Sequence, residues 1–97
     1  MQRRGRESGI LKIYKYRGRC NASGNNIRRI REQKQWSQEQ LAAKLQLAGV
    51  DTSQKTISRV EMGARVVPDY ELAYYARVLD TTVLWLLGLE TDDSSVS

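Results

Sequence analysis

The chain has 97 residues, which is enough for one small domain, and its 16 Lys and Arg against 11 Asp and Glu give a net charge of +5. It contains no His and a single Cys, so the usual zinc ligand set, a Ser-His or Cys-His catalytic pair and an internal disulfide are excluded. The charge is uneven: residues 1–24 sum to +6, residues 25–67 to +4 and residues 68–97 to −5. This gradient suggests a polyanionic partner for the N-terminal two-thirds.

The composition divides the chain into three parts. Residues 1–24 are rich in Arg and lack structural periodicity, so they are expected to be a flexible basic arm, although residues 10–16 could form a short strand. Residues 25–90 are expected to form the folded domain, and residues 91–97 an acidic, polar, disordered tail. The longest apolar run, residues 83–87, is too short to span a bilayer, and lysines interrupt the apolar stretch near the N-terminus. We therefore expect a soluble, cytoplasmic protein.

Two helices are expected in the first half of the domain. The first covers about residues 26–35 and turns Ile27 and Ile30 inward. The second begins at Ser37, whose hydroxyl can form a capping box with Gln40. Gly49 can end this second helix in a left-handed conformation. Its inward positions are expected to be Leu41, Ala42, Leu45 and Ala48.

Three more helices are expected in the second half. One begins with Ser53 or Thr52 as its N-cap and ends at Gly63, and another follows Pro68. The last begins after Thr82. Their inward positions are expected to be Ile57 and Val60, then Leu72, Ala73, Ala76 and Leu79, then Val83, Leu86 and Leu87. Residues 25–90 show no alternating strand pattern, which predicts an all-α domain of five compact helices.

The third helix has an outer face of long polar side chains. If Ile57 points inward, Lys55 and Arg59 point directly outward, and Gln54 and Thr56 flank them near the start of the helix. Arg and Lys can donate to guanine, Gln can pair with adenine, and the Thr methyl group can contact thymine. Such a face is often only solvated surface, but its place second in a tight helical pair within a positive segment favours reading of the DNA major groove.

The order of these motifs resembles the phage repressor and Cro type of helix-turn-helix, the xenobiotic-response-element family. The similarity covers residues 26–89, about two-thirds of the chain. It lies in Ile27-Arg28-x-Ile30-Arg31, in Trp36 to Ala42, in Thr56 to Gly63, and in Ala76 to Leu79 with Val83-x-Trp85 to Gly88. It implies a lambda-repressor-like DNA-binding domain of bacterial or phage origin, associated with the nucleoid.

The resemblance also implies roles for single residues. The positions that face bases in the family are matched by Gln54, Lys55, Thr56 and Arg59. Contacts to the DNA backbone are expected from Gln38, Ser53, Ser58 and Arg65. Gln38 can also brace a base-reading side chain. Arg31 and Glu61 match a partly buried ion pair between the first and third helices. No catalytic residue, metal or cofactor is implied.

One departure from the family pattern concerns the turn before the third helix. The stretch between Leu45 and Ile57 is about five residues longer than the usual short turn of the motif. Either the second helix is extended or the turn is a true loop, and the third helix could therefore sit at a shifted angle.

The end of the domain is unusually apolar for a short helix. It carries more large apolar side chains than a short helix can bury on one side, namely Val83, Leu84, Trp85, Leu86, Leu87 and Leu89. We therefore expect Leu84, Trp85 and Leu89 at a contact between two copies, although Trp85 could instead pack on a neighbouring helix. We expect a homodimeric repressor on a pseudo-palindromic operator. Two alternatives remain: a DNA-binding antitoxin or controller of a two-gene module, whose C-terminal helix binds a protein partner, and a protein-interaction or RNA-binding module that has lost DNA readout.

Overall fold

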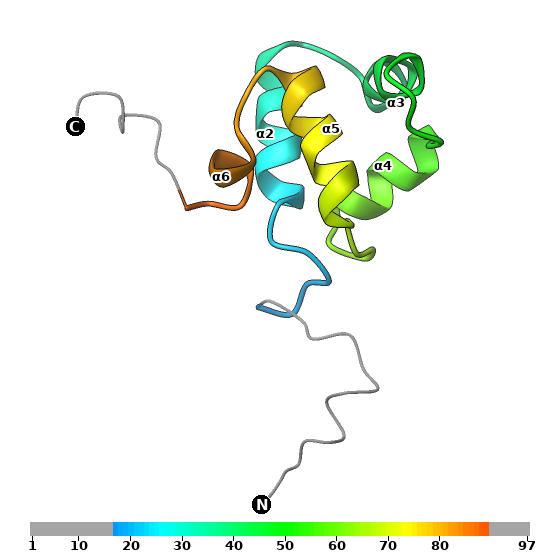
Figure 1. Cartoon of the computed structure of the whole chain (residues 1–97). Helices are drawn as coiled ribbons and strands as arrows, with labels where there is room; N and C mark the ends of the chain where they lie inside the picture. The colour runs from blue at the N-terminus through cyan, green and yellow to red at the C-terminus, as the bar shows by residue number, and fades with distance from the viewer. Residues whose placement is uncertain (1–16, 90–97) are drawn as a thin grey trace, which may run out of the picture.

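The fold is all-α, as the sequence predicts. The structure, a computed structural model, describes residues 17–89. In this part the chain forms five helices (Figure 1), namely α2 (Gly24–Gln33), α3 (Gln38–Leu47), α4 (Gln54–Glu61), α5 (Asp69–Leu79) and α6 (Val83–Leu86). Residues 1–16 of the expected arm, with the expected short strand, and residues 90–97 lie outside the described residues. No helix between residues 17 and 89 is long and apolar enough to cross a membrane.

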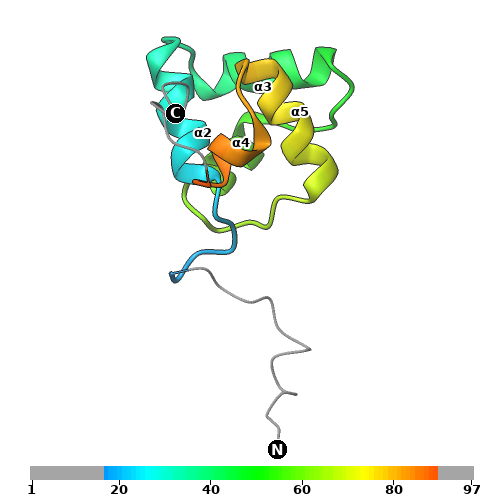
Figure 2. The same cartoon turned by 60° about the vertical axis from the view of Figure 1, so that its left-hand side comes forward.

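Helices α2 and α5 lie at the centre, and the others cover them from two sides. Helices α3 and α4 pack on one side, and α6 packs against α2 and α5 on the opposite side (Figures 1 and 2). The core between them is built from side chains of every helix and of the loop after α3. Its buried members are Ile27, Leu41, Ala42, Leu45, Val50, Ile57, Val60, Leu72, Tyr75, Ala76, Leu79 and Leu86.

The helix boundaries follow from local side-chain chemistry. At α3, the Ser37 hydroxyl accepts from the Gln40 backbone N–H at 3.0 Å, and the Ser37 N–H donates to the Gln40 side chain at 2.7 Å, so the predicted capping box is present. Gly49 ends this helix with a φ of +107°, a conformation that favours glycine. Thr82 caps α6 by accepting from the Trp85 N–H.

The inward face of α5 differs from the expected one. Ala73 was predicted to be buried but is exposed, and Tyr75 is buried in its place with 1% of its surface exposed. The buried stripe of α5 is therefore Leu72, Tyr75, Ala76 and Leu79, an i, i+3, i+4, i+7 pattern. At the end of α3, Ala48 is only half-buried, and Val50 in the following loop fills the core.

The packed part of the chain begins before residue 25. Asn21 and Ser23, which the sequence analysis assigns to the basic arm, are buried against the domain. Helix α2 begins at Gly24, two residues before the expected start. The short segment from Arg19 to Ser23 therefore packs with the helices and lies beside the end of α4.

Candidate nucleic-acid interface

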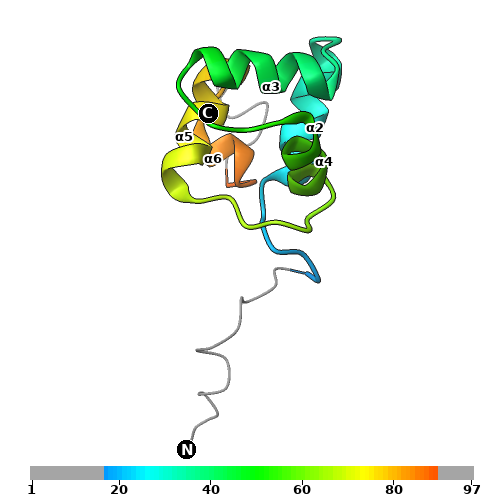
Figure 3. The same cartoon turned by 90° about the vertical axis from the view of Figure 1, so that its right-hand side faces the viewer.

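Helices α3 and α4 form a helix-turn-helix pair with an ordered loop between them. Figure 3 shows α3 running across the domain and α4 lying below its start. The connection over residues 48–53 is a true loop, because α3 ends at Leu47 and is not extended. Val50 is buried, and the Gln46 side chain donates to the Thr52 carbonyl at 2.7 Å. These contacts fix the extra length of the turn against the domain.

The outer face of α4 carries the base-facing side chains suggested by the sequence. Gln54, Lys55 and Arg59 are exposed, whereas Ile57 and Val60 on the opposite face have no exposed surface. Thr56 is half-buried, and its hydroxyl lies 3.2 Å from the Ser53 hydroxyl. Helix α4 thus presents a long, polar, positively charged ridge to the outside.

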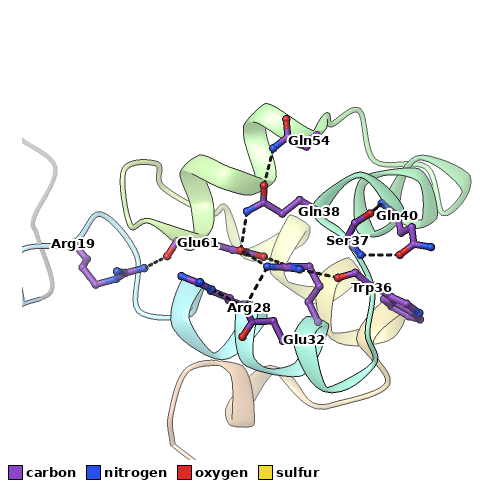
Figure 4. A network of polar contacts seen from close by, with 10 residues as sticks. Arg19, Arg28, Glu32, Trp36, Ser37, Gln38, Gln40, Gln54 and Glu61 are labelled. Carbon is purple, nitrogen blue, oxygen red and sulfur yellow. Dashed lines mark hydrogen bonds and ion pairs between the residues drawn. The ribbon is translucent and has the colours of Figure 1, made fainter.

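A chain of polar contacts connects the start of α4 to the interior (Figure 4). The Gln54 side-chain amide donates to the Gln38 side-chain oxygen Oε1 at 2.6 Å, and the Gln38 side-chain amide donates to the Glu61 carboxylate at 3.0 Å. Glu61 in turn accepts from Arg31 through Nε at 2.6 Å and Nη2 at 3.0 Å. Because Gln38 bonds to both Gln54 and Glu61, the orientation of Gln54 is coupled to a buried ion pair.

The Arg31–Glu61 pair is buried and bidentate. Arg31 and Glu61 expose only 8% and 4% of their surfaces, and the remaining Arg31 Nη1 donates to the Trp36 carbonyl at 2.7 Å. The hydrogen bond to Glu61 and the charge of that carboxylate raise the pKa of Arg31, although burial opposes the shift. The pair joins α2 to α4 and fixes the angle between them.

The residues expected at the DNA backbone are distributed around α4. The Ser53 hydroxyl is the N-cap of α4 and accepts from the Thr56 N–H, and Ser58 is half-buried. Gln38 has its amide engaged as described above. The Arg65 guanidinium lies 3.2 Å from the Glu71 carboxylate on α5 and 3.3 Å from the Val66 carbonyl oxygen, so the loop between α4 and α5 is tied to α5.

A hollow separates the starts of α3 and α4 at the surface. Its volume is about 250 Å³, and it is lined by Ser37, Gln38, Glu39 and Gln54. Both helix N-termini carry partial positive charge, and Glu39 places a carboxylate in the same lining. Among residues 17–89 no cluster of His, Cys, Asp and Glu could hold a metal ion.

The apolar residues expected at a dimer contact lie on α6 and just after it. Leu84 and Leu89 are exposed by 52% and 72%, respectively. Trp85 is half-buried against the core, and the Arg29 guanidinium lies 5.5 Å from the centre of its ring. Trp85 therefore packs on α2, whereas Leu84 and Leu89 are open to a partner.

Two contacts at the other end of α4 have no counterpart among the residues singled out in the sequence. Arg19 and Asn21 donate hydrogen bonds to the backbone at the C-terminal end of α4. Both precede α2 and have no helical periodicity, so pattern analysis gives no signal for them.

Comparison with known families assigns this arrangement. A helix-turn-helix family model matches residues 27–86, more than half of the chain and all of α3 to α6. The chain belongs to the Cro/C1-type helix-turn-helix family. Curated proteins and solved structures give no match. In this Cro/C1-type domain α3 and α4 are the helix-turn-helix pair, and membership implies DNA binding in a family that is typically non-catalytic.

Proposed function

We propose that the protein is a sequence-specific regulator of transcription, acting as a repressor, that reads the major groove of double-stranded DNA with α4. The observation that carries this proposal is the exposed ridge of Gln54, Lys55 and Arg59 on a helix whose opposite face is fully buried. An α-helix fits the major groove, and these side chains reach base edges there. We place the protein in the cytoplasm, where it meets its DNA.

The side chains of the ridge have distinct expected roles. Arg59, at the C-terminal end of the ridge, suits a bidentate contact to guanine, and Lys55 suits a single contact to the same type of base. Gln54 suits adenine, and its bond to Gln38 holds the amide before DNA arrives. This orientation lowers the entropy cost of binding. Thr56 can place its methyl group against thymine.

Backbone contacts are expected from the residues around this ridge. The Gln38 amide has two N–H groups, of which one donates to Glu61, and the second is available for a phosphate oxygen. The hydroxyls of Ser53 and Ser58 can do the same at the edge of the groove. Arg65 has N–H groups beyond those that meet Glu71 and Val66. Such contacts position the protein but do not read sequence.

We also propose a homodimer, which the exposed apolar side chains at the end of the domain support. Leu84 and Leu89 are the apolar patch that a second copy can cover. A twofold dimer would place two α4 helices in successive major grooves about 34 Å apart, on a pseudo-palindromic operator. The same exposed leucines favour a second candidate, a DNA-binding antitoxin or controller whose partner protein covers this patch. If the Leu84→Glu variant dimerises as the wild type does, the dimer does not use this patch, and this second candidate is favoured.

Replacement of Arg59 tests the proposal. Arg59→Ala is expected to weaken binding to the cognate site by about 1–3 kcal/mol and to leave binding to random DNA almost unchanged. Arg77→Ala is the matched control, because Arg77 is exposed on α5, where its guanidinium lies 5.2 Å from the centre of the Tyr74 ring. Titrations of both variants on both DNAs measure the difference. An equal loss on the two DNAs would contradict base reading by Arg59.

A further inference from the structure

The segment from Arg19 to Ser23, here called the clasp, crosses the C-terminal end of α4. Arg19 Nη2 donates to the Glu61 carbonyl at 2.7 Å (Figure 4). The Asn21 Nδ2 donates to the carbonyls of Val60 at 3.0 Å and Arg65 at 2.7 Å. The Cys20 N–H donates to the Gly63 carbonyl at 2.8 Å. The clasp thus contacts the backbone from the last turn of α4 to the following loop.

These bonds add to the backbone bonds that end α4, because the last carbonyls of an α-helix have no partner within the helix. The Val60 carbonyl already accepts from the Gly63 N–H at 3.0 Å, and Asn21 gives it a second bond. The Glu61 carbonyl accepts from Arg19. Asn21 is 8% exposed, so water cannot readily replace its amide. Its carbonyl oxygen accepts from the Gly24 N–H at 2.7 Å. One side chain therefore joins the start of α2, the end of α4 and the loop that carries Arg65.

Two glycines make room for the clasp. A Cβ atom at Gly24 would lie 2.2 Å from the Val60 carbonyl oxygen, so α2 and α4 approach backbone to backbone. Gly63 has a φ of +78°, and a Cβ there would lie 2.6 Å from Arg19 Cζ. The guanidinium of Arg19 therefore packs directly on the turn that ends α4.

We propose that the clasp positions α4 for DNA binding and that Asn21 is its central positioning residue. The proposal rests on the proposed function, in which α4 reads DNA. The start of α4 is held through Gln54 and Gln38, and the clasp adds to the Arg31–Glu61 pair at its other end. Loss of the two bonds from Asn21 loosens the turn at Gly63, and with it the directions of Arg59 and of the Arg65 loop. Misplaced base contacts lower discrimination between cognate and random DNA more than they lower total charge attraction.

The test uses an almost isosteric change. Asn21→Asp keeps an oxygen for the Gly24 N–H but places a second oxygen against the carbonyls of Val60 and Arg65. Asn25→Asp, on the exposed first turn of α2, is the control for the added charge. Without DNA, amide hydrogen exchange at Gly63 and Ala64 is expected to accelerate about tenfold or more in Asn21→Asp, and to stay near the wild-type rate in Asn25→Asp.

The second measurement is the ratio of the affinities for cognate and random DNA, at a temperature at which circular dichroism shows that each variant is folded. Asn21→Asp is expected to lower this ratio about tenfold relative to Asn25→Asp, with an unchanged salt slope. Equal exchange rates in the two variants would refute the claim that the clasp holds the end of α4. Faster exchange in Asn21→Asp with an unchanged affinity ratio would refute its role in DNA binding. If the wild type binds cognate and random DNA equally well, the proposed function fails, and the exchange rates alone then support or refute the structural role of the clasp.

A second pair of variants serves if Asn21→Asp does not fold. Arg19→Met removes the bond to the Glu61 carbonyl and keeps an apolar stem over Gly63, and Arg77→Met, at an exposed position on α5, removes the same charge. Faster exchange and a lower ratio in Arg19→Met alone support the clasp. The same values in both variants overturn it.

Discussion

Replacing Glu61 by Gln is expected to destabilise the domain by about 3 kcal/mol. The Glu61 carboxylate is 4% exposed and accepts three hydrogen bonds, two from Arg31 and one from Gln38. Removal of one partner from a buried ion pair costs about 3–5 kcal/mol, because the other charge stays buried without compensation. Gln keeps one acceptor oxygen, so the loss lies at the low end of this range. It corresponds to a decrease in Tm of about 12–24 °C for a domain of this size.

Urea denaturation followed by circular dichroism measures this loss. A double-mutant cycle combines Glu61→Gln, Arg31→Met and the double variant. The loss of unfolding free energy in the double variant is expected to be smaller than the sum of the two single losses by at least about 2 kcal/mol. Arg28→Met is the control, since Arg28 makes an exposed i, i+4 pair with Glu32 at 3.1 Å and should contribute at most about 0.5 kcal/mol. A Glu61→Gln loss below about 1 kcal/mol would show that the pair behaves as a surface pair and would refute this reasoning.

Three further predictions concern other parts of the chain. Burial raises the pKa of Tyr75 above its ordinary value of 10.0, so the free energy of unfolding should decrease as the pH rises above about 10. Tyr75→Phe should remove this decrease in denaturation measured at several pH values, and the control Tyr70→Phe, at an exposed position, should keep it. Ser37→Ala should cost about 1 kcal/mol in urea denaturation through loss of the capping box, and an unchanged midpoint would contradict this. Deletion of residues 1–16 should weaken binding to cognate and random DNA by the same factor and flatten the salt dependence, whereas a changed ratio of the two affinities would indicate an arm that reads sequence.

Much of the fold can be predicted because its signals are local. Ser37 and Gln40 define the start of α3 by their own hydrogen bonds, and the inward positions of α4 follow from Ile57 and Val60. The side of α5 is less certain from sequence. Ala73 and Tyr75 flank Leu72 at compatible angles, and only the packing of α5 against the rest of the domain determines that the larger ring is buried.

The contacts around α4 illustrate the limit of pattern reading. The outward direction of Arg59 follows from helical geometry, but the bond from Gln54 to Gln38 depends on the relative placement of two helices. Asn21 was assigned to a basic arm because side-chain bonds to backbone carbonyls of distant residues have no period. Such long-range contacts become visible only when α2 and α4 are brought together.

Selection of bound sequences from random double-stranded DNA tests the central claim most directly, which is that α4 reads base edges. The wild-type protein is expected to enrich one motif with two inverted half-sites about one helical turn apart, at centres about 34 Å from each other. Arg59→Ala, selected in parallel, is expected to lose preference at one base pair of each half-site and to keep the others. Recovery of no common motif by the wild type, or of the same motif with the same preferences by Arg59→Ala, would contradict the assignment of α4 as the reading helix.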